Sequence, residues 1–70
     1  MISYAPLWKT MAEKKISKYM LIRNGIAQST ISRMVKNKPT SSETINALCR
    51  ILDCKVGDIM EYTNDDDVES

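Results

Sequence analysis

Apolar residues recur at helical spacing in five stretches of the chain, and short polar breaks separate these stretches. The clearest stretch is residues 42–52, where four apolar positions follow the i, i+3, i+4, i+7 pattern of one helix face: Ile45, Leu48, Cys49 and Leu52. Similar spacing predicts four further helices, over about residues 4–14, 18–24, 28–36 and 56–60. Because helix formers dominate and glycine and proline are rare, the sequence predicts an all-α fold.

The first two helices have recognisable signals at their ends. Ser3 is placed to cap the first helix after an irregular lead-in over residues 1–4, and Pro6 falls in its first turn, where a missing amide costs little. Ser17 is predicted to cap the second helix. Gly25 then supplies the turn that follows, because glycine tolerates a positive φ.

The later helices have end signals of unequal strength. Ala27 stands where the third helix begins, and its side chain cannot accept a capping hydrogen bond. Pro39 ends that helix, because proline disfavours helical geometry at the preceding Lys38. Thr40 and Glu43 have the spacing of a capping box for the fourth helix. The last predicted helix offers three apolar side chains to the core: Val56, Ile59 and Met60.

The predicted third helix has two chemically different faces. Its apolar side is expected to pack on the rest of the protein and consists of Ile31, Met34 and Val35. The opposite side carries five polar or cationic side chains: Gln28, Ser29, Ser32, Arg33 and Lys36. The two-pronged ends of Arg and Gln match base edges, and a short Ser lets the backbone come close. We therefore predict that residues 17–38 form a helix-turn-helix that lays this helix in the major groove of double-stranded DNA.

Charge is divided unevenly along the chain, although the net charge is only +1. Residues 1–38 carry eight Lys and Arg against Glu13 alone, which gives +7, whereas residues 39–70 carry a net −6. A positive pole around the third helix is the electrostatic footprint of a protein that binds polyanions. The distribution therefore favours the DNA-binding interpretation over a purely structural helical bundle.

The size of the chain narrows the possible functions. Seventy residues make one domain with a small core, so no separate domain is expected to bind a small-molecule effector. The sequence has no His, and it offers no nucleophile–base pair, so we do not expect an enzyme. No stretch approaches the length of a membrane span or has the apolar core of a secretory signal, and we expect a cytoplasmic protein.

We expect neither the two cysteines nor the acidic end of the chain to form a metal site or another special structure. Cys49 and Cys54 cannot complete a four-ligand zinc site without His or further Cys, so no metal or other cofactor is predicted. Their spacing allows a disulfide, but free thiols in a reducing cytosol are the better interpretation. Residues 63–70 are acidic and nearly without apolar side chains, which predicts a disordered tail rather than a metal site or a phosphate mimic.

Two segments of the chain resemble a known family. GIAQSTISRM and, downstream, ETINALCRILDCKVGDIMEY are similar to the Cro/C1-type (XRE-like) helix-turn-helix family, specifically its short single-domain bacterial members. The resemblance covers about Tyr4 to Tyr62 and implies a compact five-helix, lambda-repressor-like domain over residues 1–62. It also implies a sequence-specific transcriptional regulator that acts as a homodimer on a palindromic operator.

The resemblance implies roles for individual residues. Gln28, Ser29 and Arg33 match the positions of the recognition helix that reach base edges. We expect seven further residues to contact phosphate or to flank the base-reading set: Ser17, Lys18, Thr30, Ser32, Lys36, Asn37 and Lys38.

The sequence departs from the family pattern at two places. Where the two helices of the helix-turn-helix usually meet through a small residue, this chain has Leu21 or, in a shifted alignment, Ile22, which predicts a wider crossing. Ala27 replaces the usual capping Ser or Thr. The rival interpretation is a protein-binding module, antitoxin-like or a docking unit, that uses the acidic second half of the chain.

Overall fold

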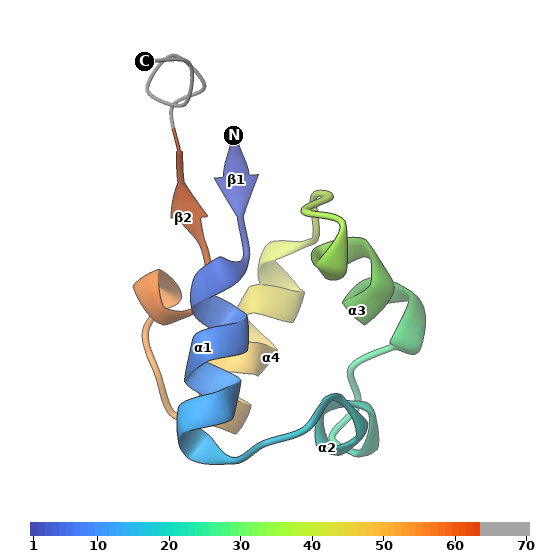
Figure 1. The fold of residues 1–70 in the computed structure, drawn as a ribbon. Coiled ribbons are helices and arrows are strands. Elements are labelled where there is room, and N and C mark those ends of the chain that lie inside the picture. Colours follow the sequence, from blue (N-terminus) through green and yellow to red (C-terminus); the bar gives the residue numbers. More distant parts are fainter. Residues whose placement is uncertain (64–70) are drawn as a thin grey trace.

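The computed structural model describes residues 1–63 of the chain as a small helical domain. Its order of elements is β1 (Ile2–Ser3), α1 (Ala5–Lys14), α2 (Lys18–Arg23), α3 (Gln28–Val35), α4 (Ser42–Leu52), the 3₁₀ turn η1 (Val56–Asp58) and β2 (Glu61–Tyr62). Figure 1 shows α1 and α4 packed together, with α2 and α3 beside them at one margin of the molecule. The predicted all-α helix-turn-helix fold is confirmed, but the fifth predicted helix is only a 3₁₀ turn.

The irregular lead-in predicted for residues 1–4 is wrong in part. β1 pairs antiparallel with β2, so that Ile2 lies opposite Tyr62 and Ser3 lies opposite Glu61. The Met1 ammonium also donates to the Thr63 carbonyl at 2.6 Å, and the Thr63 amide donates to the Met1 carbonyl at 2.8 Å. Thr63 therefore belongs to this pairing, whereas the rest of the predicted acidic tail, residues 64–70, lies outside the described residues.

A single core collects apolar side chains from every helix and from the residue after η1. Its buried members are Tyr4, Leu7, Met11, Leu21, Ile26, Ile31, Met34, Leu48, Leu52 and Ile59. Two residues that were expected inside are half exposed, Val35 at 50% and Val56 at 54%. Val35 lies at the edge of the apolar stripe in the last turn of α3. Val56 opens the short turn η1, and the residues that pack on the core, Ile59 and Met60, follow this turn.

All four α-helices end in the same hydrogen-bonded motif. An amide two residues beyond the end of α1 and α4, and three residues beyond the end of α2 and α3, donates to the carbonyl five residues earlier, at 2.9–3.0 Å. This is the Schellman pattern, which needs a left-handed residue between the bonded pair. Gly25 fills that position with φ 103° at α2, but the other three helices use Lys15, Asn37 and Asp53, with φ between 51° and 58°. The bonded pairs are Met11–Ile16, Leu21–Ile26, Arg33–Lys38 and Cys49–Cys54.

The helix starts differ in how well they are capped. Ser17 caps α2 as predicted, because its Oγ accepts from the Met20 amide at 3.2 Å. The capping box predicted at Thr40 and Glu43 is wrong by one residue, since Ser41 Oγ accepts from the Thr44 amide at 3.2 Å. Tyr4 occupies the cap position of α1, and Ser3 Oγ accepts from the Ala5 amide. Ala27 gives α3 no side-chain cap.

The cysteines are free thiols, as predicted. Partial burial, with Cys49 and Asp58 nearby, raises the pKa of the Cys54 thiol above its ordinary value of 9.0, so it stays neutral at physiological pH. Within residues 1–63, no group of three or more potential ligands could hold a metal ion. In the same part of the chain, none of the helices has the length and apolar character needed to cross a bilayer.

Candidate nucleic-acid interface

The turn between α2 and α3 is set by Gly25. The Gly25 amide donates to the Ile22 carbonyl at 3.1 Å, and the Ile26 amide returns to the Leu21 carbonyl at 3.0 Å. Gly25 has φ 103°, a backbone conformation that residues with a Cβ rarely adopt. Crowding is not the reason for glycine at this position, because an added Cβ would meet no atom within 4 Å. Leu21 is fully buried and Ile22 is 39% exposed, so Leu21 takes the place where the family has a small residue.

The polar face of α3 is open to solvent. Ile31 and Met34 are buried and hold the helix on the core. Five predicted contact residues on this helix and its last turn are exposed: Gln28, Ser29, Ser32, Arg33 and Lys36. Figure 1 shows α3 at the margin of the molecule, with α1 on its inner side. Thr30 differs, since it is half-buried and lines a small cavity with Ala27, Ser41 and Glu43.

Arg33 is exposed, yet its side chain has a fixed partner. Its guanidinium donates from Nε at 3.3 Å and from Nη2 at 2.9 Å to the carbonyl oxygen of Pro39. Both contacts join the last turn of α3 to the loop that leads to α4. The sequence pattern placed Arg33 on the outer face but gave no sign of this contact, because a backbone carbonyl six residues away depends on the path of the loop.

The loop after α3 is itself tied to the rest of the domain. Asn37 lies in the left-handed region with φ 57°, and its Oδ1 accepts a hydrogen bond from the Tyr4 amide at 3.0 Å. The side-chain oxygen of Asn37 therefore has a structural partner, and only its amide group remains to donate outward. Lys36 and Lys38 flank it and are both exposed.

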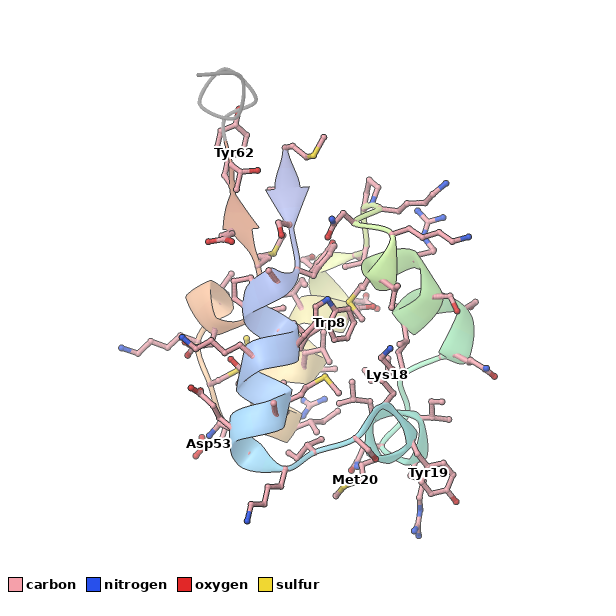
Figure 2. All side chains as sticks on the ribbon, in the orientation of Figure 1. Trp8, Lys18, Tyr19, Met20, Asp53 and Tyr62 are labelled. Carbon is pink, nitrogen blue, oxygen red and sulfur yellow. The ribbon has the colours of Figure 1, made fainter. Side chains whose placement is uncertain are left out.

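The start of α2 carries the remaining predicted contacts. The Oγ of Ser17 is engaged as the helix cap. Figure 2 shows the Lys18 side chain directed at Trp8, and the distance from Nζ to the ring centroid is 5.2 Å, a cation–π contact. This contact draws Lys18 toward α1 in the free protein. Releasing Lys18 to a phosphate costs little, because cation–π contacts at exposed sites are worth only about 0.5–1 kcal/mol.

A second aromatic–cation pair on α2 was not anticipated. Tyr19 is 67% exposed, and the guanidinium of Arg23 lies 6.0 Å from its ring centroid. Figure 2 shows Tyr19 pointing away from the body of the protein. The i, i+4 spacing of the two residues was the available signal, because such pairs face each other on a helix.

The charge division seen along the sequence becomes a division in space. In Figure 2, Asp53 lies on the opposite side of the view from Lys18 and Tyr19. Asp58 and Glu61 border a hollow between α1 and η1, away from α3. Glu43 is one exception, since it lines the small cavity beside the start of α3, and Lys9 is another, since it borders the same hollow as Asp58 and Glu61. The exposed face of α3 therefore adjoins cations on α2 and on its own last turn.

Comparisons with known proteins agree with this geometry. The family model for the Cro/C1-type HTH DNA-binding domain matches residues 6–65. The chain belongs to the Cro/C1-type helix-turn-helix family. One relative of the chain is YozG of Bacillus subtilis (strain 168), an uncharacterised HTH-type transcriptional regulator. It is 38% identical over 61 residues, and the match covers 81% of this chain and 71% of the relative.

A solved structure shares the Cro/C1-type fold seen here. The crystal structure of the transcriptional regulator VanUg, Form II, superposes with a TM-score of 0.79 at 34% sequence identity, over 86% of this chain and 81% of that chain. The family resemblance predicted from the two sequence segments is thus confirmed. The family is defined by a DNA-binding domain, and the relative and the solved structure are both described as transcriptional regulators, so this Cro/C1-type protein belongs to a class of DNA-binding regulators.

Proposed function

We propose that the protein binds specific double-stranded DNA sequences with α3 in the major groove and regulates transcription at those sites. The observation that carries this proposal is the division of α3, in which Ile31 and Met34 are buried and the polar face is exposed. A helix held in this way can enter a groove about 12 Å wide without moving the core.

Recognition is proposed to have two layers. Three lysines bind phosphates and fix the register without reading sequence: Lys18, Lys36 and Lys38. Ser17, Thr30, Ser32 and Asn37 add flanking polar contacts to this layer. Base edges are read by Gln28, Ser29 and Arg33, with Gln28 suited to adenine N6 and N7 and Arg33 suited to guanine O6 and N7.

We further propose that the protein acts as a homodimer on a palindromic operator. Each bidentate contact is worth only about 1–3 kcal/mol of discrimination, so one monomer with two such residues selects poorly within a genome. Two copies reading half-sites about one DNA turn apart double the number of contacts.

A groove on the protein supports a second copy as the partner. It lies between α4 and η1, and its apolar lining consists of Ile45, Cys49, Cys54, Val56 and Met60. Thr40 and Met60 also border a second hollow that reaches Ile2 and Pro39, so the apolar surface continues to the loop beside Arg33. A copy seated here would lie near the loop beside Arg33, and we propose that this contact sets both recognition helices along one duplex.

The proposal is tested by selecting bound duplexes from a random pool and then titrating two variants. A two-fold symmetric consensus is expected. Arg33→Ala should weaken binding to the selected duplex by about 5-fold to 150-fold, with little effect on random duplexes. Lys38→Ala should weaken binding to both duplexes similarly. Equal losses on both duplexes for Arg33→Ala would remove it from the base-reading residues.

A protein-binding module remains the second candidate, because the same apolar groove could seat a partner protein instead of a second copy. Salt separates the two. A DNA-bound dimer with about six phosphate contacts loses about 10³-fold in affinity between about 50 and 200 mM salt. A protein that shows no affinity for any duplex at low salt belongs to the second class.

A further inference from the structure

The guanidinium of Arg33 is held by one edge only. Nε and Nη2 both donate to a single acceptor, the Pro39 carbonyl, so the side edge of the planar group is used. The end edge, formed by the outer N–H groups of Nη1 and Nη2, has no acceptor among residues 1–63. A planar guanidinium offers its donors in a fixed fork, so fixing one edge also fixes the direction of the other.

The free edge of Arg33 is the one that suits bidentate recognition. Two parallel N–H groups match guanine O6 and N7, and they match two phosphate oxygens equally well. An arginine on an open helix face otherwise samples many rotamers, and ordering it opposes binding. The Pro39 carbonyl removes part of that cost before DNA arrives.

The position of the Pro39 carbonyl depends on Asn37. The amides of Asn37 and Lys38 close α3 by donating to the carbonyls of Met34 and Arg33, at 3.0 and 2.9 Å. The left-handed conformation of Asn37 turns the chain back at this point. Its Oδ1 then binds the amide of Tyr4, which is only 1% exposed and therefore gives the loop an anchor in the core.

We propose that Asn37 is a positioning residue for base recognition: it anchors the loop so that the Pro39 carbonyl presents the end edge of Arg33 to a guanine. This inference rests on the proposed function, and it gives Asn37 a part in specificity beyond a phosphate contact. A merely structural role for Asn37 and Arg33 would change stability without changing which base is preferred.

The test uses three variants and two operator positions. The first position is the guanine whose preference is lost in Arg33→Ala, and it is compared with adenine at the same place; the second is the position that Gln28 reads. Asn37→Gly keeps the left-handed turn but removes Oδ1, whereas Asn37→Asp keeps an oxygen acceptor and adds a charge. We expect Asn37→Gly to reduce the guanine preference at least threefold and to leave the base preference at the Gln28-dependent position unchanged.

Asn37→Asp serves as the matched control. Its charge should weaken binding to every duplex, and the guanine preference should stay within twofold of the wild type. Full guanine preference in Asn37→Gly, or an equal loss at every operator position, would overturn the positioning role. A wild-type protein without any base preference would instead contradict the proposed function itself. Failure of the positioning role and failure of the proposed function are therefore distinguishable.

A second measurement does not depend on DNA. In the free protein, the Arg33 Nε–H should be ordered on the NMR timescale, in contrast to the Nε–H of exposed Arg50. In Asn37→Gly, and in Asn37→Ser if the glycine variant folds poorly, the Arg33 signal should become as mobile as that of Arg50. An Arg33 signal that is already mobile in the wild type would contradict the proposal.

Discussion

Single residues in unusual backbone conformations determine where this chain turns. Lys15, Asn37 and Asp53 have positive φ although each carries a Cβ, and Gly25 is the one glycine among the four helix-ending positions. Asn and Asp adopt this region comparatively easily, but a lysine does so at a cost, since an L-residue loses about 1–2 kcal/mol there. Lys15 is therefore the least suited of these residues to its own conformation.

Replacing Lys15 by glycine should stabilise the protein. Relief of the left-handed strain exceeds the extra backbone entropy of glycine, and we expect a gain of about 0.5–1 kcal/mol in the free energy of unfolding. For a domain of this size, this gain raises the melting temperature by about 2–8 °C. Urea unfolding followed by circular dichroism measures it.

Lys14→Gly is the matched control, because it places the same residue at the last helical position of α1, where glycine gains nothing from a positive φ and should cost up to about 1 kcal/mol. A destabilised Lys15→Gly variant would show that the lysine side chain has a stabilising contact that outweighs its backbone strain.

Predictability also differs from residue to residue. The exposure of Gln28, Ser29 and Ser32 followed from helical periodicity, which depends only on local spacing. The hydrogen bonds of Arg33 to Pro39 and of Asn37 to Tyr4 did not, because each joins groups whose relative position is set by loop dihedrals or by packing across the domain.

The secondary-structure elements were the most predictable level. The predicted range of α4 is the same as the observed one, and the observed α2 and α3 end one residue earlier than predicted. The strands β1 and β2 escaped prediction, since two residues carry no periodicity and their partners are about 60 positions apart. The shift of the α4 cap to Ser41 arose because Thr40 and Ser41 are both capable caps and only the loop path chooses between them.

The unequal capping of the two helix-turn-helix elements has a consequence for stability. Ala27 has φ −66° and ψ 140°, the extended conformation of a cap residue, but it has no acceptor. Ala27→Ser should therefore add a hydrogen bond to the first turn of α3 and stabilise the protein by about 1 kcal/mol. Thermal unfolding measures the gain.

The reverse substitution at α2 provides the comparison. Ser17→Ala removes the existing cap and should cost about 1 kcal/mol. If Ala27→Ser leaves the melting temperature unchanged while Ser17→Ala lowers it, the first turn of α3 does not accept a side-chain cap.

At the scale of the whole molecule, the two ends of the described chain are joined. β1 and β2 pair, and Met1 and Thr63 exchange hydrogen bonds beyond them, as the neighbouring N-terminal and β2 segments in Figure 1 indicate. Both strands of this small sheet are largely exposed. We therefore expect the sheet to make only a small contribution to the free energy of unfolding.

Truncation after Met60 tests that contribution. Loss of β2 and Thr63 removes the hydrogen bonds to β1, and we expect a loss of about 1 kcal/mol in the free energy of unfolding. Truncation after Thr63 keeps both strands and should leave the stability unchanged. Chemical denaturation of the two shortened chains measures the difference, and equal midpoints would mean that the sheet adds nothing.

The Schellman motif at the end of α3 brings together different side chains from those at the other helices. Elsewhere it brings two apolar or thiol side chains to one side, but here the paired positions are Arg33 and Lys38, with Lys36 beside them. The partial negative charge of the helix end offsets only part of this crowding of cations. We expect a multivalent anion such as sulfate to neutralise the remainder, which would link folding thermodynamically to occupancy of this corner. Melting temperatures measured in phosphate buffer therefore include a contribution from the buffer, and they should exceed those measured in a buffer of monovalent ions at equal ionic strength.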